Sequence, residues 1–487
     1  MPLTTYAAAV DLGATSGRVI LGAWSKGGLK LTEVHRFSNR FRSLGGHDYW
    51  DIGGLWQEAQ VGLQRAAAAL PRGARLASVG VDAWGVDYAL LNDAGRLVFP
   101  VHAYRDPRTQ PGLQRLGRTR AALERIYAAT GIPNVFYNTS LQLEETVASC
   151  PAVADLATRC LFLPDYFNYL LSGRMENELT IASTSQLLDV HGIGWSRATL
   201  DHFHIPPSWF TPPVLAGTRL GRVRGIPELA GAQVIAVPGH DTACAYDAMP
   251  AAPDGSDLFI SSGTWSLVGT LIEQPRNGAA AAAENFTNLG AVGDRICFHK
   301  NVNGMWLIRQ CTDQWALDGT VWKVPELVAA SELVPCPEGL LDVDDPDLLL
   351  PERMPQRINA QRVKRGLTPL DESPANAPEF ASLIFHSLAA RYAKVLDRVA
   401  FLTGKRLKRL FIVGGANQNT FLNRLTQEAT RLEVHRGSPE SSTVGNFAVQ
   451  LATLEGSRDP ITGAYAEPVA RWAGMFIDAL DAAPVPE

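Results

Sequence analysis

The chain alternates between short apolar runs that end in polar or glycine-rich turns and longer segments with apolar residues at helical spacing. Residues 7–23 hold two apolar stretches around a turn of small and hydroxyl residues, which predicts a strand, a tight turn and a second strand. The same pattern returns at 258–270. Strands mixed with helical segments are typical of α/β proteins, and the repeated pattern indicates an internal duplication.

The remaining elements follow from the same two periodicities, and Pro71, Gly131 and Gly173 mark helix ends. A hairpin is predicted from 89–91 and 97–101, around Asn92-Asp93-Ala94-Gly95. The other predicted strands are 29–36, 76–81, 161–163, 234–237 and 410–413, and the predicted helices are 52–70, 119–130, 166–171, 380–402 and 445–455.

Near the midpoint, a strand ending at Val237 is broken by Pro238-Gly239 and followed by His240, Asp241 and Thr242 at the start of a helix of small residues. A carboxylate beside a histidine at a strand-to-helix switch is where α/β proteins tend to place chemistry. Asp and Thr are also good helix caps that need no ligand. This stretch alone supports both interpretations.

Asp11 ends the first strand, before a turn with two glycines and two hydroxyl residues. Backbone N–H groups in such a turn can face an anion, and the carboxylate can hold Mg²⁺ through water. An ordinary hairpin that satisfies its own turn is the alternative. No G-x-x-x-x-G-K-[ST] motif is present, and no G-x-G-x-x-G motif follows the first strand.

Two further turns carry candidate chemistry. The strand at 76–81 leads into Asp82-Ala83-Trp84-Gly85-Val86-Asp87, where an aromatic side chain and carboxylates suit hydrogen bonding to a polyol. The strand at 410–413 leads into Gly414-Gly415, where backbone can approach a flat ligand such as adenine. A satisfied loop and an ordinary αβ turn are the respective alternatives.

Composition limits the class of protein. A length of 487 residues predicts two or more domains, and 46% hydrophobic with 19% charged residues is typical of a globular chain with ample core. A net charge of −5 argues against a general nucleic-acid binder. Six cysteines without a C-x-x-C pair predict reduced thiols and a cytoplasmic location, and no apolar run reaches the roughly 18 residues of a membrane span.

The order of these turns along the chain is more specific than any one of them. It resembles the actin-like ATPase fold and, within it, the FGGY family of carbohydrate kinases. The resemblance implies a two-lobed α/β (ribonuclease H-like) fold with a cleft between duplicated domains: 1–246 for the sugar and the catalytic Asp, and 247–487 for ATP. It rests on VDLGATSGRVIL (10–21), VDAWGVDYALL (81–91), LPDYFNYLLSG (163–173), HDTACA (240–245), SSGTWSLVG (261–269), HKNVNGMWL (299–307) and FIVGGANQNTFLN (411–423).

The same resemblance implies residue roles. Asp241 would be the general base and Asp11 would lie near Mg²⁺. The sugar would be lined by Gly85, His240, Asp241 and Thr242, and ATP would be contacted by Ala14, Thr15, Ser16, Gly17, Arg18, Thr264, Asn301, Gly414 and Gly415. Three positions depart from the pattern: Arg309 stands in place of a Gln, Ala416 in place of a third glycine, and Leu289-Gly290-Ala291 in place of Glu-Gly-Gly.

The implied activity is ATP-dependent phosphorylation of a ketose, at the 1-hydroxyl of L-rhamnulose, by a monomer or homodimer without nucleic-acid or membrane partners. L-Fuculose, xylulose or a related polyol are alternative substrates within the family. A non-catalytic actin-like nucleotide-binding protein is the alternative from another class. The pair His240-Asp241 at the predicted sugar pocket argues against it, because such a protein needs no base there.

Overall fold

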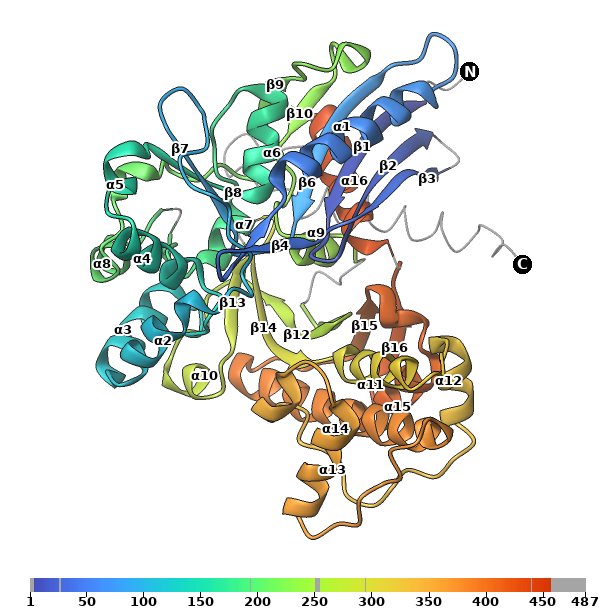
Figure 1. The fold of residues 1–487 in the computed structure, drawn as a ribbon. Coiled ribbons are helices and arrows are strands. Elements are labelled where there is room, and N and C mark those ends of the chain that lie inside the picture. The colour runs from blue at the N-terminus through green and yellow to red at the C-terminus, as the bar shows by residue number, and fades with distance from the viewer. Residues whose placement is uncertain are drawn as a thin grey trace. The chain divides into compact units, whose positions relative to one another are not determined.

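The computed structural model describes residues 4–25, 28–192, 194–249, 255–293, 295–438 and 440–456 (Figure 1). The chain divides into two compact units. Unit 1 is drawn from Met1–Pro250, Ile272–Phe298 and Glu440–Glu487, and unit 2 from Ala251–Leu271 and His299–Pro439. Residues 250–254 and 457–487 of the predicted C-terminal domain lie outside the described residues.

Five strands of each large sheet share one topology, and the sixth strand is added at opposite edges of the two sheets. In each, an antiparallel hairpin carries a further strand on its outer side, and its first strand pairs in parallel with a strand from later in the chain. The matching order confirms the predicted duplication. The first sheet runs β3 (Gly28–Ser38), β2 (Ser16–Ser25), β1 (Thr5–Leu12), β6 (Leu76–Ala83), β10 (Gln233–Ile235), β9 (Arg219–Arg222), and the second β13 (Thr287–Gly290), β14 (Ile296–Asn303), β12 (Trp265–Ile272), β11 (Asp257–Ser262), β15 (Arg409–Val413), β16 (Glu433–Arg436).

Helices cover both faces of the first sheet. Helices α1 (Ile52–Ala68) and α6 (Leu163–Ser172) pack on one face with Ala8, Val10 and Leu12 of β1, and α16 (Ser441–Leu454) packs on the other with Ala7 and Ala9. Because side chains alternate along a strand, Asp11 belongs to the face that carries α16. The same alternation on β6 places Val79 and Val81 with α1, and Ser78, Gly80 and Asp82 toward α16.

The short helix α9 (Asp241–Asp247) follows β10 and packs directly on α16. A side chain at Gly445 would place its Cβ 1.8 Å from the carbonyl oxygen of Cys244, so the two backbones touch. Glycine is therefore required at this helix crossing.

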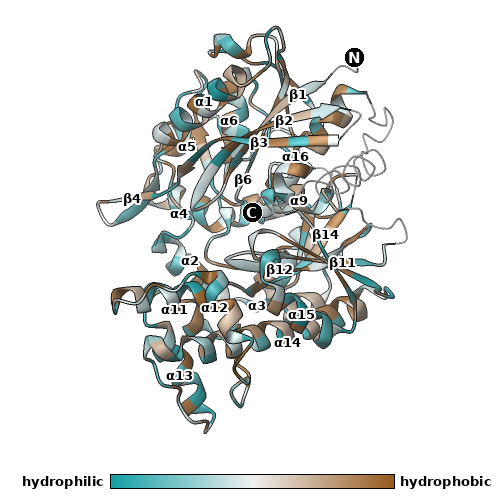
Figure 2. Cartoon of the chain, turned by 90° about the vertical axis from the view of Figure 1, so that its right-hand side faces the viewer, coloured by the Kyte–Doolittle hydropathy of each residue, from teal (hydrophilic) through white to brown (hydrophobic). Residues whose placement is uncertain are grey.

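A second, mostly helical core lies in unit 1. The hairpin of β4 and β5 projects from this unit and is exposed along β4 (Figure 2). The bounds of these elements are β4 Phe41–Leu44, β5 His47–Trp50, β7 Tyr88–Leu91, β8 Arg159–Phe162, α2 Gln110–Gly117, α3 Arg120–Thr130, α4 Thr139–Ser149, α5 Val153–Leu156, α7 Leu179–Ala182, α8 Arg197–His202 and α10 Ala279–Ala283.

Unit 2 is built around one long helix, α14 (Ala377–Thr403). Its inner face buries a continuous apolar stripe, and Phe385 meets Phe421 with 6.1 Å between ring centroids. The other helices of this unit are α11 Trp306–Leu317, α12 Val324–Ser331, α13 Met354–Lys364 and α15 Thr420–Thr430.

Most predicted elements are confirmed, with boundaries that shift by up to one turn. The hairpin of 89–91 with 97–101 forms only next to its turn. Leu91 bridges antiparallel to Leu97, and Val98 N–H donates to the Leu90 carbonyl at 3.0 Å, but the pairing does not extend to a strand over 97–101. The longer pairing of β7 is with β8, which the sequence did not predict.

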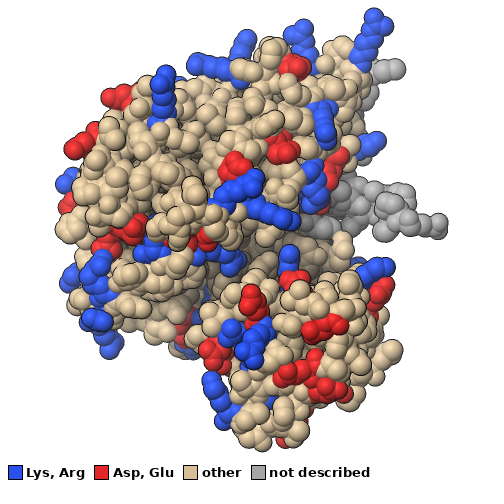
Figure 3. Space-filling model, in the orientation of Figure 1, with Lys and Arg blue, Asp and Glu red and all other residues tan. Residues whose placement is uncertain are grey.

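On the face shown in Figure 3, acidic and basic side chains are intermixed over the surface of each unit. Among the described residues, none of the helices combines the length and the apolar character that a membrane crossing requires.

Candidate active site

Two carboxylates lie side by side where parallel strands of unit 1 end. Asp11 on β1 is the register partner of Asp82 on β6. Arg18 on the neighbouring strand donates to Asp11 Oδ2 from Nε at 3.0 Å and from Nη2 at 2.7 Å. Ser442 of α16 donates its hydroxyl to the same oxygen at 3.0 Å. Asp11 is therefore held by residues far apart in sequence.

Asp82 is fully buried and only partly satisfied. Its Oδ2 accepts from Asn446 Nδ2 at 2.6 Å, while its Oδ1 is buried without a hydrogen-bond partner in the described part of the chain. Burial and the neighbouring Asp11 charge hold the pKa of Asp82 well above its usual range. An unpartnered buried carboxylate oxygen beside a second carboxylate is a fitting place for a cation.

These two acids suit Mg²⁺ better than a metal bound by protein alone. Mg²⁺ prefers one or two carboxylates together with phosphate oxygens and water. The described residues include no group of three or more His, Cys, Asp or Glu side chains that could enclose a metal ion. Asp11 and Asp82 therefore fit a magnesium ion whose other ligands come from a bound phosphate and water.

A polar stripe on α16 supports both acids. Ser442, Asn446 and Gln450 lie four residues apart, on the face that meets the sheet. Gln450 Nε2 donates to Asn446 Oδ1 at 2.6 Å and to the Ala8 carbonyl at 3.1 Å, and its Oε1 accepts from Ser78 at 2.6 Å. Glu440, just before the helix, pairs with Arg18. Sequence reasoning missed Glu440, Ser442 and Asn446, and it placed Asp82 with the polyol loop and not beside Asp11. The polar residues at four-residue spacing in an otherwise apolar helix were the available signal.

The loop before α9 lies against the end of β6. Ala83 bridges in parallel to His240, and its N–H donates to the Gly239 carbonyl at 2.9 Å. Asp241 is the first residue of the helix, and the cap position before it belongs to His240. The interpretation of Asp241 as the side-chain cap of this helix is therefore wrong.

The carboxylate of Asp241 has an unusual environment. Thr242 donates its hydroxyl to Asp241 Oδ1 at 3.1 Å, and His240 Nε2 lies 3.6 Å from the same oxygen, beyond hydrogen-bond distance. Burial, followed by the charge of Asp11, raises the pKa of Asp241 to about 7, against the opposing effects of Thr242 and Arg18. The side chain keeps 35% exposure, so it remains reachable. A reachable carboxyl that titrates near neutrality can accept a proton.

The loop after β6 is fixed by a buried acid. Asp87 Oδ2 accepts from the indole N–H of Trp50 at 2.6 Å, from that of Trp84 at 2.8 Å and from the backbone N–H of Tyr104 at 3.3 Å, and Oδ1 accepts from Gln142 at 3.2 Å. The two indole rings lie 4.5 Å apart. Burial raises the pKa of Asp87 to about 6, against these hydrogen bonds.

Gly85 lies in this same loop, beside a third segment. Thr184 accepts the N–H of Val86 on its hydroxyl at 3.1 Å, and a Cβ at Gly85 would lie 3.2 Å from Thr184. Gly85 and His240 thus lie on loops that meet at the end of β6, and Asp241 and Thr242 begin α9 directly after His240.

The first predicted phosphate turn is also in unit 1. Ala14 and Thr15 connect β1 to β2, and Ser16, Gly17 and Arg18 begin β2, with Thr15 exposed and its carbonyl accepting from Asn39 N–H at 3.0 Å. The guanidinium of Arg18 is 19% exposed and already paired with Asp11 and Glu440. Because the Arg18 side chain is already paired, the backbone N–H groups of the turn are the groups suited to bind a phosphate.

The nucleotide residues predicted from the second half lie in unit 2. Exposed Thr264 is in the turn between β11 and β12, Asn301 is on neighbouring β14, and Gly414 and Gly415 follow β15. Gly414 has φ 85° and ψ 175°, and a Cβ there would lie 2.7 Å from the Ser262 carbonyl oxygen. The structure therefore brings the Gly414 turn against the end of β11, close to the turn that carries Thr264.

The three departures from the family pattern lie on three different elements. Arg309 is an exposed residue of α11 whose guanidinium lies 3.7 Å from Asp313. Ala416 is in the 3₁₀ turn after Gly415, and Leu289 is buried on β13. Gln310, beside Arg309, accepts the N–H of Glu352 at 2.8 Å.

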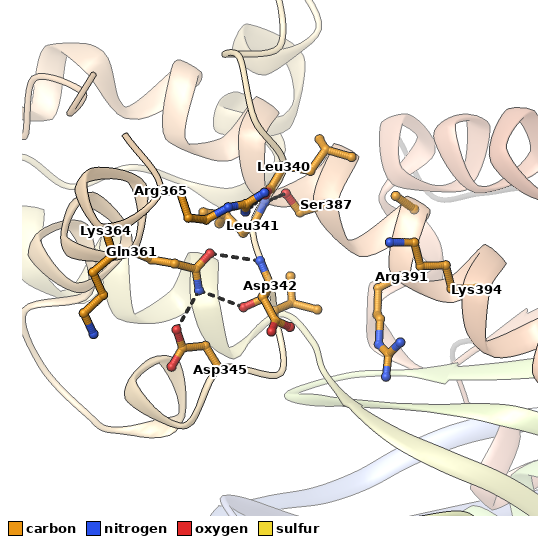
Figure 4. A pocket seen from close by; sticks show the side chains of 12 residues that line it. Leu340, Leu341, Asp342, Asp345, Gln361, Lys364, Arg365, Ser387, Arg391 and Lys394 are labelled. Atoms are coloured by element: carbon orange, nitrogen blue, oxygen red, sulfur yellow. Dashed lines mark hydrogen bonds between the residues drawn. The ribbon is translucent and has the colours of Figure 1, made fainter. Parts of the chain in front are cut away.

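Unit 2 also contains a pocket of about 590 Å³ between α13 and α14 (Figure 4). Gln361 crosses it to bond Asp342 and Asp345. Two of its four cations pair with acids, Lys364 with Asp347 and Arg391 with Asp344, and Arg365 donates to the Leu340 carbonyl. The lining residues are Leu340, Leu341, Asp342, Val343, Asp345, Gln361, Lys364, Arg365, Ser387, Ala390, Arg391 and Lys394.

The chain belongs to the FGGY family of carbohydrate kinases. Residues 6–246 match the family's N-terminal domain and residues 258–454 its C-terminal domain. The chain is therefore an ATP-dependent carbohydrate kinase.

The chain is also similar to individual proteins along more than nine-tenths of its length. The chain is 36% identical to the rhamnulokinase of Bacteroides thetaiotaomicron over 455 residues, which cover 93% of this chain and 91% of that protein. It is 37% identical to the rhamnulokinase of Klebsiella pneumoniae subsp. pneumoniae over 452 residues, covering 92% and 90%.

Solved structures agree on the fold. The gluconate kinase from Lactobacillus acidophilus superposes with a TM-score of 0.73 at 13% identity, covering 98% of this chain and 97% of that one. The xylulose kinase from Rhodospirillum rubrum gives 0.73 at 18% identity, covering 98% of each chain. The predicted actin-like α/β fold is confirmed.

Proposed function

We propose that this kinase transfers the γ-phosphoryl group of ATP to the 1-hydroxyl of L-rhamnulose. The observation that carries the proposal is Asp241: a reachable carboxylate with a pKa raised to about 7 at the start of α9. The rhamnulokinase relatives support the choice of sugar, since they match along nearly the whole chain. L-Fuculose, xylulose or a related polyol are the alternative acceptors.

Phosphoryl transfer needs positioning and charge neutralisation more than covalent chemistry from the protein. Asp241 would accept the proton of the attacking hydroxyl, and a base near neutral pKa is matched to that task. His240 and Thr242 on either side and the loop at Gly85 would orient the sugar.

Asp11 and Asp82 would hold Mg²⁺, which supplies positive charge to the phosphates when bound. Their placement at adjacent strand ends, with Asp82 Oδ1 unpartnered among the described residues, supports this role. Backbone N–H groups of residues 14–18 and the turns at Thr264, Gly414 and Gly415 would contact ATP, with Asn301 nearby.

We extend the proposal to the organisation of the enzyme. Residues 1–246 would form the domain that binds sugar and carries the base, and 247–487 the domain that binds ATP. The enzyme would act in the cytoplasm as a monomer or homodimer. A non-catalytic nucleotide-binding protein would have no need for a proton acceptor such as Asp241.

The test is a panel of ketoses and polyols assayed with Mg-ATP by coupled ADP release. L-Rhamnulose should give the highest kcat/KM, and ³¹P–¹H correlation spectroscopy should place the product phosphate on C1. A higher kcat/KM with L-fuculose or xylulose would reassign the substrate. ADP release that no sugar stimulates would overturn the proposed reaction.

A further inference from the structure

A buried glutamate outside the predicted site bonds directly to the loop that carries Asp241. Glu178 is 1% exposed and stands at the cap position of α7. Its Oε2 accepts from Thr180 N–H at 2.9 Å, Ile181 N–H at 3.2 Å and the Thr180 hydroxyl at 2.6 Å. The same oxygen also accepts from Gly239 N–H at 2.8 Å. Three of these hydrogen bonds come from residues of α7, and the fourth comes from the loop before α9.

The same loop meets α7 at two more points. His240 N–H donates to the Thr180 hydroxyl at 3.4 Å, so one hydroxyl connects the loop and the carboxylate. A Cβ at Gly239 would lie 2.8 Å from Ile181. The backbone of 239–240 therefore lies directly on α7, with the bond to Glu178 at its centre.

The other end of this short segment reaches the loop at Gly85. Helix α7 continues into the 3₁₀ turn Ser183–Ser185. There Thr184 donates to the Ile181 carbonyl at 2.8 Å and accepts Val86 N–H at 3.1 Å. One segment thus contacts both the loop with Asp241 and the loop with Gly85.

Capping alone does not explain a glutamate at this position. Helix α7 has only four residues, and a neutral Ser, Thr or Asn caps a helix well. Burying a carboxylate costs free energy unless it is strongly bonded. Burial raises the pKa of Glu178 to about 7, in spite of its hydrogen bonds to Thr180, Gly239 and Ile181. Beyond capping, the same Glu178 oxygen accepts from Gly239 N–H and so also holds the loop before α9.

We propose that Glu178 is a positioning residue for phosphoryl transfer, which fixes the Gly239–His240 backbone and thereby the Asp241 carboxylate relative to the loop at Gly85. The inference rests on the proposed function of Asp241 as the base. Misplacing a reacting group by about 1 Å can cost roughly 10²-fold in rate. Loss of the anchor should therefore appear mainly in kcat.

The test compares Glu178→Gln with three matched variants. Glu178→Gln keeps shape and removes the charge. Thr180→Val removes the bridging hydroxyl, and Thr180→Ser restores it. Asp247→Asn is the control, because Asp247 is a buried acid (2% exposed) on the same helix as Asp241 but pairs with Arg295 at 3.3 Å.

Two measurements separate positioning from general stability. Glu178→Gln should lower kcat about 10- to 100-fold while the KM for ATP stays within about two-fold. Without any substrate, it should also speed amide hydrogen exchange in peptides covering 238–242. Thr180→Val should show both effects more weakly, and Thr180→Ser and Asp247→Asn neither. If Glu178→Gln does not fold, the Thr180 pair decides the test.

The outcomes are distinguishable. Normal kcat in Glu178→Gln, or unchanged exchange in 238–242, would overturn the positioning role while an active wild type leaves the proposed function intact. Equal losses in Asp247→Asn would show that any buried acid near α9 matters, which also overturns the role. A wild type inactive on every sugar would overturn the proposed function, and this inference with it.

Discussion

The two units present chemistry in different ways. In unit 1 the candidate groups include three carboxylates besides the backbone of the turn at 14–18. Asp11 and Asp82 lie at strand ends and are held by bonds from α16, and Asp241 lies at a helix start. In unit 2 the candidate groups are mostly backbone, in a turn at Thr264 and at a glycine with φ 85°. Five strands of each sheet share one topology, so the difference lies in the turns.

This contrast predicts different sensitivities to substitution. A site made of carboxylates should respond to changes of charge that keep shape. A site made of backbone should respond to an added Cβ and tolerate changes of side-chain polarity. Four variants test the contrast.

The largest effect is expected from Asp241→Asn. The substitution removes the proton acceptor and keeps the size of the side chain, and a positioned base contributes about 10²–10⁴-fold in rate. We expect kcat to fall by roughly that factor while the protein still binds Mg-ATP, measured by steady-state kinetics and calorimetric titration. Turnover within a few-fold of wild type would show that Asp241 is not the base.

Stability provides the control for this variant. Burial raises the folded pKa of Asp241 to about 7, above its usual value, so the folded state holds a proton that the unfolded chain releases at lower pH. This group therefore makes wild-type stability decrease as pH rises from about 4 to 7. Asp241→Asn should be folded and should show a shallower decrease in denaturant titrations over that range.

The next largest effect is expected from Asp87→Asn. Its Oδ2 accepts from both indole N–H groups, and its Oδ1 accepts from Gln142 Nε2. The NH₂ group of an Asn at this position would therefore face at least one of these N–H donors. Gln142 cannot reverse freely, because its Oε1 already accepts from Arg108 at 2.9 Å. Losing a bond to a charged acceptor costs about 1.5–3 kcal/mol.

We expect the KM for sugar to rise about ten-fold or more in Asp87→Asn, with the KM for ATP unchanged, since 1.4 kcal/mol corresponds to a factor of ten. Asp257→Asn is the matched control, because this buried acid pairs with Arg409 in unit 2. A sugar KM that moves equally in both variants would assign the effect to stability alone.

Much of unit 1 was predictable from local pattern. The hairpin at Asp11, the strand before Asp82 and the helix beginning at Asp241 follow from apolar periodicity and from Pro238-Gly239. The pairing of 89–91 with 159–162 was not predictable, because the sequence of an apolar strand does not specify which distant strand pairs with it.

The residues that hydrogen-bond to Asp11 and Asp82 could not be predicted from the local sequence pattern. Asn446 reaches Asp82 across 364 residues, and Ser442 reaches Asp11 across 431. Only the alternation of side chains on β1 and β6, combined with knowledge of which helix covers which face, places them together. Glu178 is similar, since its bond to Gly239 spans 61 residues.

In unit 2 the larger effect is expected from Gly414→Ala. The backbone at φ 85° and ψ 175° is essentially restricted to glycine, and a Cβ would lie 2.7 Å from the Ser262 carbonyl oxygen. We expect a loss of about 1–3 kcal/mol in the free energy of unfolding and a raised KM for ATP. Gly415→Ala is the control, because a Cβ there meets nothing within 4 Å. Equal stability of the two variants would contradict the backbone argument.

The smallest effect is expected from Thr264→Val. Thr264 is exposed in the turn between β11 and β12, and its carbonyl oxygen accepts Trp306 N–H at 3.2 Å, so the turn is held by backbone and survives the substitution. The hydroxyl is then one neutral donor to a phosphate among several backbone donors, worth about 0.5–1.5 kcal/mol. We expect the KM for ATP to rise about two- to ten-fold with the KM for sugar unchanged, and Thr264→Ser to restore it. A fall in kcat as large as that of Asp241→Asn would show that this turn, too, depends on its side chain. An unchanged KM for ATP together with an unchanged kcat in Thr264→Val would contradict the assignment of Thr264 to ATP.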